Sequence, residues 1–301
     1  MHAARKILNS TEKQNLNPAS SMQIIAVCAG KACLGKTNIA LNLSLVLAKN
    51  NKKVLLLDAN LGNSSLCIND ILGLTSKYNL SHVKQNLCSL QDLLLDGPDH
   101  IKLLSIVGNE LSFSDLSLTA RSKVVNEFNA LTDNFDYLII DSTAGIPGAL
   151  LNFPPSSLEL IIVTNNDPTS IAASYTFMKI MSKRYKIDKF HIIANMVNSL
   201  REGYDLFKKI SRVAGYLLKV NLEYLGAIPF DQSVGQAIKK QMPVLFAYPD
   251  TRATQAFYNM NEIITNWRNF KKHEGTLSGP FIAASTYESS RGDSVGIIPS
   301  V

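Results

Sequence analysis

The sequence predicts an α/β fold: a doubly wound, mostly parallel sheet with helices on both faces. Strand-length runs of consecutive apolar residues alternate along the chain with longer segments of helical periodicity. Continuously apolar strands are typical of parallel sheets, because both faces of such sheets are buried. The first strand-like run is also joined to the first helix-like run by a glycine-bounded loop, which is the arrangement found in phosphate-binding loops.

The elements follow in order. The first strand is predicted at 23–27, and its helix begins near Lys36, where apolar residues recur at helical spacing. Pro168 is favourable in the first turn of a helix, so a helix is expected to begin there. The remaining strands are predicted at 54–58, 103–107, 136–141, 160–163, 191–194 and 222–228, and the remaining helices at 118–131, 202–217 and 252–271.

The last predicted helix allows two interpretations. Its apolar stripe follows an i, i+3, i+4 pattern and is formed by Ala253, Ala256, Phe257, Met260, Ile263, Ile264, Trp267 and Phe270. A stripe of this width is typical of a helix that packs on a sheet. The alternative is a helix that lies on a membrane surface, with its apolar side down and Arg268, Lys271 and Lys272 beside it.

Composition describes an ordinary core-forming protein, with 46% hydrophobic and 18% charged residues. Residues 1–21 are polar and are expected to form a flexible N-terminal segment without the apolar core of a secretory signal. Residues 22–273 are predicted to form one nucleotide-binding domain, and the Gly-, Ser- and Thr-containing residues 274–301 a disordered tail. No apolar run approaches the ~18 residues that span a bilayer.

The charge, cysteine and histidine content indicates which locations, metal sites and partners are to be expected. The four cysteines form no CxxC pair, so a cytoplasmic location is expected rather than a disulfide framework. The five histidines do not cluster in the sequence, which argues against a histidine-based metal site. The net charge is +6, and basic residues concentrate between Lys179 and Lys219. That concentration is either a set of solvated helix faces or a patch for a membrane or nucleic acid.

The glycine-bounded loop reads Gly30-Lys31-Ala32-Cys33-Leu34-Gly35-Lys36-Thr37 and matches GxxxxGK[ST]. Backbone N–H groups in such a loop form a concave anion site, and the following helix adds the positive end of its dipole. Lys36 would neutralise β- and γ-phosphate charge, and the Thr37 hydroxyl would ligate Mg²⁺. The loop therefore predicts a site for a nucleotide and Mg²⁺.

Two strand-end carboxylates complete the predicted site. Asp58 ends one buried strand, where it would orient Mg²⁺-bound water, and Asp141 ends another, where it would face the metal. Parallel sheets bind ligands at the carboxyl ends of their strands, so both groups are expected near the loop. The alternative role of a strand-end aspartate is to cap a helix or turn.

Several motifs together resemble the MinD/ParA family of ATPases. The early lysine in Gly30-Lys31, with Lys36-Thr37, resembles that family's deviant phosphate loop (deviant Walker A). The sequences of these motifs are most similar to those of the family's flagellar-number regulators, the FleN or FlhG type. The resemblance covers about residues 22–267. Segments 54–62 and 141–146 resemble the family's two switches, and further matches lie at 167–171, 195–198 and 226–231.

The resemblance implies roles for individual residues. It implies an ATP-dependent homodimer with nucleotides sandwiched between subunits, in which Lys31 reaches the partner's phosphates. Asn195 and the loop of Pro229 and Asp231 would hold adenine. The implied nucleotide-binding residues are Gly30, Lys31, Ala32, Cys33, Leu34, Gly35, Lys36, Thr37, Asn38, Asn195, Pro229 and Asp231; the implied metal ligands are Thr37, Asp58 and Asp141; and the implied catalytic residues are Lys31, Lys36, Asp58 and Asn60.

The resemblance also implies partners. Regulators of this type act with a flagellar GTPase of the signal-recognition type and with a flagellar transcription activator. Their C-terminal amphipathic helix contacts the inner face of the cell membrane, and residues 252–272 are the corresponding segment here. Residues 1–21 do not resemble the N-terminal segment with which some relatives stimulate the GTPase, so stimulation of such a GTPase is not expected.

The chain departs from the family pattern at two places. Ala32-Cys33 stands where the family has two glycines, which allow φ > 0 at little cost. Asn60 stands where the family has the aspartate that positions the attacking water, and an amide cannot accept a proton. We therefore expect ATP binding with slow hydrolysis to ADP and phosphate. The alternatives are a ParA-like, DNA-associated partition ATPase and a scaffold that no longer binds nucleotide.

Overall fold

The computed structural model describes residues 22–59, 67–105, 118–142 and 158–267. Within them, one sheet has eight strands in the order β3-β4-β2-β5-β1-β6-β7-β8. All its neighbouring strands are parallel except β3, which pairs with β4 in the antiparallel sense. The strands are β1 (Gln23–Cys28), β2 (Val54–Ala59), β3 (Leu94–Asp96), β4 (Lys102–Ser105), β5 (Tyr137–Ser142), β6 (Leu158–Thr164), β7 (Lys189–Val197) and β8 (Asn221–Pro229).

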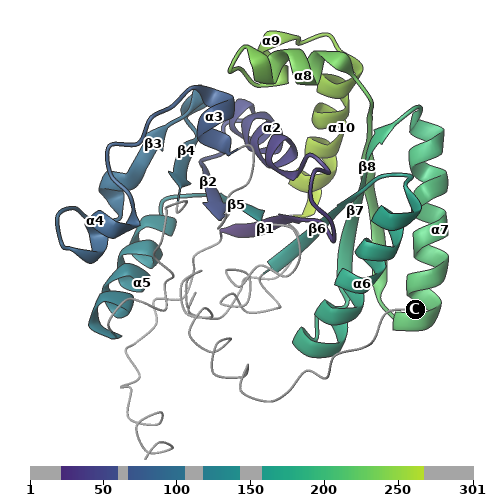
Figure 1. Cartoon of the computed structure of the whole chain (residues 1–301), viewed down its shortest axis with the longest axis horizontal. Helices are drawn as coiled ribbons and strands as arrows, with labels where there is room; N and C mark the ends of the chain where they lie inside the picture. The colour runs from purple at the N-terminus through teal and green to yellow at the C-terminus, as the bar shows by residue number, and fades with distance from the viewer. Residues whose placement is uncertain (1–21, 60–66, 106–117, 143–157, 268–301) are drawn as a thin grey trace, which may run out of the picture.

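Helices cover both faces of the sheet (Figure 1). One face carries α2 and α10, with the short α3, α8 and α9 beside them, and the other carries α4, α5, α6 and α7. The predicted doubly wound fold is therefore confirmed. The helices are α2 (Lys36–Lys49), α3 (Ile68–Leu72), α4 (Leu80–Lys84), α5 (Leu118–Thr132), α6 (Pro168–Tyr185), α7 (Leu200–Leu218), α8 (Gln232–Lys239), α9 (Val244–Ala247) and α10 (Arg252–Asn266), with 3₁₀ turns at Gln91–Leu93 and Pro98–His100.

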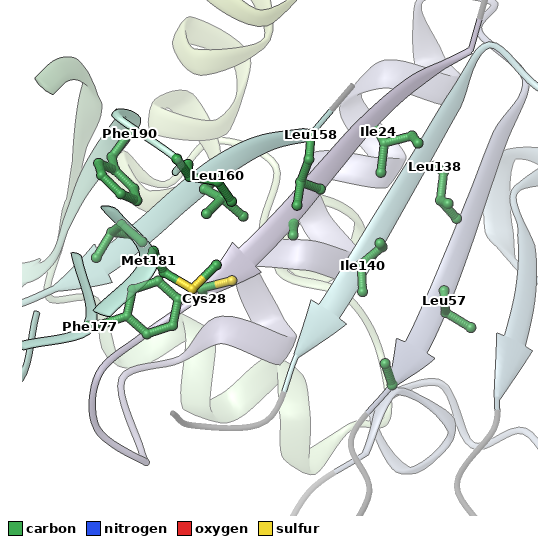
Figure 2. Packing of buried hydrophobic residues seen from close by; sticks show 14 of the residues in the cluster. Ile24, Cys28, Leu57, Leu138, Ile140, Leu158, Leu160, Phe177, Met181 and Phe190 are labelled. Carbon is green, nitrogen blue, oxygen red and sulfur yellow. The ribbon is translucent and has the colours of Figure 1, made fainter. Parts of the chain in front are cut away.

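The alternation of side chains along the strands builds two hydrophobic cores. In β1, Ile24 and Cys28 belong to the core under α5, α6 and α7, whereas Ile25 and Val27 belong to the core under α2 and α10. Figure 2 shows the first core, in which Phe177 of α6 packs with residues of the central strands. Burial on both faces explains why the strand sequences are continuously apolar.

All seven predicted strands are present, although residues 106–107 of the strand expected at 103–107 lie outside the described residues. The prediction missed β3, α3, α4, α8 and α9. These elements are three to eight residues long, which is too short for a period to be recognised. The expected flexible segment 1–21 and disordered tail 274–301 also lie outside the described residues.

The structure confirms the packing interpretation for the last helix. Phe257, Met260, Ile264 and Trp267 are at most 6% exposed and belong to the core between α10 and the sheet. Ile263 is the exception, at 40% exposed. Residues 268–272 lie outside the described residues. Among the helices of the described part of the chain, none has the length and apolarity needed to cross a membrane.

Candidate nucleotide site

The loop between β1 and α2 has the tight backbone that a phosphate loop requires. A Cβ atom at Gly30 would lie 2.2 Å from the carbonyl oxygen of Ala173 in α6, so only glycine fits there. Gly35 has φ +80° and lies directly before α2. Cys33 also has a positive φ, of 60°, although it carries a side chain. The backbone at Cys33 is thus left-handed, and a residue with a Cβ atom occupies this conformation under strain.

The first turn of α2 presents its free N–H groups toward the loop. No side chain caps this helix end, and no acidic residue lies in its first turn. An uncapped helix N-terminus of this kind favours an anion through its N–H groups and its dipole. Lys36 and Asn38 are largely buried at the same end, and Asn38 accepts a 3.1 Å hydrogen bond from the amide of Asn42.

Asp58 and Asp141 lie side by side at the carboxyl edge of the sheet. They are register partners in the β2–β5 pair, and both are fully buried. Asp58 Oδ2 accepts a hydrogen bond of 3.2 Å from the backbone N–H of Ile68, where α3 begins. The prediction that the two strand-end carboxylates come together near the loop is therefore confirmed, and Asp58 also has the helix-capping role that was the alternative.

Asp141 is the electrostatically strained member of this pair. Neither carboxylate oxygen has a hydrogen-bond partner, although both are buried. Burial, and to a lesser degree the charge of Asp58, raise its pKa to about 7, while the Thr37 hydroxyl and the Lys36 ammonium act in the opposite direction. A buried, unpartnered carboxylate beside a second one is costly unless a cation compensates it.

These groups fit a bound magnesium ion. Mg²⁺ in nucleotide sites is held by one or two carboxylates or hydroxyls together with phosphate oxygens and water, not by an all-protein cage. The hydroxyl oxygen of Thr37 and the carboxylate oxygens of Asp141 are metal ligands of that kind. The described residues contain no group of three or more His, Cys, Asp or Glu side chains that could hold a metal ion.

Lys31 is bound by two residues of its own chain. Its ammonium lies 2.7 Å from Asp167 Oδ2 and 2.7 Å from the Thr169 hydroxyl. Asp167 also caps α6 by accepting a hydrogen bond of 3.0 Å from the backbone N–H of Thr169. The hydrogen bond from Lys31, followed by those from Thr169, lowers the pKa of Asp167 to about 2. Sequence reasoning missed this pair, although the Asp-Pro-Thr sequence itself is typical of a helix start.

Asn195 lies against the loop from the other side. Its amide donates a hydrogen bond of 2.9 Å to the carbonyl oxygen of Leu34, and the residue is 7% exposed. Pro229 pairs with Val197 at the ends of β8 and β7, so it lies at the same edge of the sheet. Asp231 caps α8 by accepting a 2.9 Å hydrogen bond from the N–H of Ser233.

The structure thus brings most of the expected site residues to one edge. The loop residues Gly30, Lys31, Ala32, Cys33, Leu34, Gly35, Lys36 and Thr37, the helix residue Asn38, the carboxylates Asp58 and Asp141, and the residues Asn195, Pro229 and Asp231 lie at or next to the carboxyl ends of β1, β2, β5, β7 and β8. Asn60 lies outside the described residues. Asp167 and Thr169 join the site through their contacts with Lys31.

Comparison with known proteins agrees with this geometry. The ParA family model, described as NUBPL iron-transfer P-loop NTPase, matches residues 20–265. The chain is 36% identical to the antiactivator FleN of Pseudomonas aeruginosa over 246 residues, which are 82% of this chain and 87% of FleN. It is 32% identical over 208 residues to the flagellum site-determining protein YlxH of Helicobacter pylori, covering 68% of this chain and 69% of YlxH.

Solved structures show the same fold. The septum site-determining protein MinD complexed with Mg-ADP from Pyrococcus horikoshii OT3 superimposes with a TM-score of 0.62 at 21% identity, covering 82% of this chain and 97% of that protein. The Aquifex aeolicus MinC:MinD cell division protein complex gives a TM-score of 0.61 at 22% identity, covering 81% and 96% of the two chains.

Proposed function

Because the chain belongs to the ParA/MinD family of P-loop NTPases, we propose that it is an ATP-dependent switch that regulates flagellar number or placement and flagellar gene expression. The flagellar part of the proposal is supported by the similarity to FleN and YlxH. The observation that carries the nucleotide part is the pair of buried carboxylates beside Lys36 and Thr37, in which, among the described residues, the only groups that favour the charged form of Asp141 are the Thr37 hydroxyl and the Lys36 ammonium.

In this proposal the loop binds the phosphates of ATP. The N–H groups at the start of α2 hold the phosphate oxygens, and Lys36 neutralises the β- and γ-phosphate charge. Thr37 and Asp141 would hold Mg²⁺, which would neutralise charge at the phosphates, and Asp58 would orient a water molecule beside it. Asn195 and the Pro229–Asp231 segment contact the adenine.

Lys31 provides the switch between monomer and dimer. Its side chain is 41% exposed and is held by Asp167 and Thr169 of the same subunit. To reach the phosphates of a partner subunit, as the family resemblance implies, the ammonium must exchange these contacts for phosphate oxygens. Asp167 and the partner's nucleotide therefore compete for the same charge, and dimerisation is favoured only when ATP is present.

Hydrolysis in this dimer is slow. Asn60 occupies the place of the water-positioning carboxylate and cannot accept a proton. Loss of such a group lowers the rate typically by about 10²–10⁴-fold. The ATP-bound dimer is thus long-lived. A long-lived bound state suits a regulator of flagellar number or placement better than rapid ATP turnover does.

The proposed partners are those of flagellar regulation: a GTPase of the signal-recognition type, a flagellar transcription activator, and the inner face of the cell membrane through residues 252–272. The apolar face of α10 is buried on the sheet. A membrane contact by this segment therefore requires either release of α10 or contact by residues 268–272 alone.

The dimer is tested by multi-angle light scattering after size exclusion, with ATP and Mg²⁺, ADP, or no nucleotide. We expect a dimer only with ATP, no dimer for Lys36→Ala, and a normal dimer for Lys179→Ala, which changes an exposed lysine of α6. A monomer under all conditions contradicts the switch.

The flagellar role is tested by counting flagella in a deletion strain complemented by each variant. A flagellar count in the deletion strain equal to that of the parent strain contradicts the role.

Two further measurements distinguish the proposed membrane-associated regulator from a ParA-like partition ATPase. ATP-dependent and salt-sensitive binding to nonspecific DNA would indicate the ParA-like partition function. Binding to anionic liposomes that is lost on removal of residues 252–301, in a truncated protein shown to remain folded, supports the membrane-associated regulator.

A further inference from the structure

Asn42 of α2 connects the first turn of that helix to α9. It is fully buried, and its Nδ2 donates hydrogen bonds of 2.7 Å to the backbone carbonyl oxygen of Asn38 and of 3.1 Å to the Asn38 side-chain oxygen Oδ1. Its own Oδ1 accepts a hydrogen bond of 3.4 Å from the backbone N–H of Leu245 in α9. One buried side chain thus contacts both the helix that follows the phosphate loop and a segment 203 residues further along the chain.

The backbone partners of Asn42 determine the orientation of both side-chain amides. A backbone carbonyl only accepts hydrogen bonds and a backbone N–H only donates them, so Asn42 must turn Nδ2 toward Asn38 and Oδ1 toward Leu245. Because Nδ2 of Asn42 is a donor, the side-chain atom of Asn38 that faces it must be the acceptor Oδ1. The other end of the Asn38 amide, Nδ2, is therefore directed away from Asn42.

The Asn38 Nδ2 group is a buried donor without a partner. Asn38 is 8% exposed, and among the described residues Nδ2 has no hydrogen-bond acceptor. Side chains of a helix lie over the turn before their own Cα atom, and for Asn38 this turn begins at the phosphate loop. A buried polar group without a hydrogen bond is costly unless a ligand or water pairs with it. A donor at an uncapped helix N-terminus fits an oxygen of a bound nucleotide and not a metal cation.

We propose that Asn42 is a positioning residue of the nucleotide site: it orients the Asn38 amide so that Nδ2 donates to an oxygen of the nucleotide, and it couples this donor to α9 through Leu245. The inference rests on the proposed nucleotide binding. Without Asn42 the Asn38 side chain adopts several rotamers, and the nucleotide must order it on binding, which weakens binding by about two- to tenfold. The coupling is reciprocal, because a nucleotide that fixes Asn38 also stabilises the contact between Asn42 and Leu245.

The proposal is tested by calorimetric titration of the full chain with ADP and Mg²⁺. ADP is used because the proposed dimer forms only with ATP, so the dissociation constant for ADP reports on the site of one subunit. We expect Asn38→Ala to bind about 10- to 100-fold more weakly, as for loss of a hydrogen bond to a charged group, and Asn42→Leu about two- to tenfold more weakly. The control Ser44→Ala also removes a buried polar group of α2, which donates a hydrogen bond of 2.8 Å to the carbonyl oxygen of Ala40, and it should bind ADP like the wild type.

The double variant separates positioning of Asn38 from a general effect of Asn42 on the helix. If Asn42 acts through Asn38, then Asn42→Leu causes no further loss of ADP affinity in a protein that already carries Asn38→Ala. An equal loss from Asn42→Leu in the presence and in the absence of the Asn38 side chain overturns the proposal. An Asn42→Leu protein that binds ADP like the wild type also overturns it.

Amide hydrogen exchange decides the question if Asn42→Leu does not fold. Saturating ADP should slow exchange of the Leu245 N–H in the wild type and not in Asn38→Ala, and equal slowing in the two proteins overturns the proposal. A wild type that binds no nucleotide contradicts the proposed function itself. A wild type that binds ADP without this coupling contradicts only the role of Asn42.

Discussion

Replacement of Cys33 by glycine tests the strain in the phosphate loop. Cys33 has φ 60°, and its exposed thiol is free, so the substitution removes a strained Cβ without removing a disulfide or a buried contact. Left-handed backbone costs an L-residue about 1–2 kcal/mol. Glycine in turn adds about 0.4–1 kcal/mol of conformational entropy to the unfolded chain. Cys33→Gly is therefore expected to be neutral or to stabilise the fold by up to about 1.5 kcal/mol.

Ala32→Gly is the matched control, because Ala32 is next to Cys33 and is not among the described residues with positive φ. It adds the same unfolded-state entropy and relieves no strain, so it should destabilise by about 0.4–1 kcal/mol. The difference in unfolding free energy between the two variants then isolates the strain, about 1–2 kcal/mol, and is measured by urea unfolding. Equal effects of the two glycines would refute the reasoning. If the loop adopts this backbone only with nucleotide, the difference appears in the ATP dissociation constant instead.

Three further substitutions test the site. Burial, followed by the charge of Asp58, raises the pKa of Asp141 from 3.8 to about 7. Because its folded-state pKa lies above the unfolded value, protonation favours the fold, and this contribution is lost as pH rises from about 4 to about 7. Nucleotide-free wild type should thus lose stability relative to Asp141→Asn over this range in urea unfolding; parallel pH profiles would show that Asp141 is not strained. Asn60→Asp is expected to increase ATP turnover, by up to about 10²–10⁴-fold in a phosphate-release assay, and no increase would indicate the Ala32-Cys33 loop as the limiting defect. Asp167→Asn keeps a good helix cap but removes the charge that holds Lys31, so ATP-dependent dimerisation should occur at lower protein concentration by analytical ultracentrifugation. An identical shift in Asp205→Asn, which frees Lys208 instead, would argue against a role for Lys31.

Much of the fold could be predicted because the sequence pattern of a buried strand or an amphipathic helix lies within one short segment of the chain. The strands at 23–28 and 54–59 are buried on both faces of the sheet. A strand buried on both faces consists mostly of consecutive apolar residues, and such a run can be recognised in the sequence. The short edge strand β3 has only half-buried and exposed positions, so its sequence shows neither a continuous apolar run nor an alternation. α8 is short and contains Gly235, which lowers helix propensity.

The site was predictable where topology forces residues together. Asp58 and Asp141 end parallel strands, and the register of β2 and β5 brings them side by side. The contacts of Lys31 and Asn195 were not predictable, because their partners lie 136 and 161 residues away and depend on how loops close over the sheet edge. The same holds for Asn42, whose partner Leu245 lies 203 residues away.

The central claim, that the loop between β1 and α2 binds the triphosphate of ATP with Mg²⁺, is tested most directly by isothermal titration calorimetry. The account predicts saturable heat with ATP and Mg²⁺ for wild type and for the control Lys179→Ala, and its loss in Lys36→Ala at unchanged stability. The absence of heat for wild type at millimolar nucleotide, or equal binding by Lys36→Ala, would contradict it.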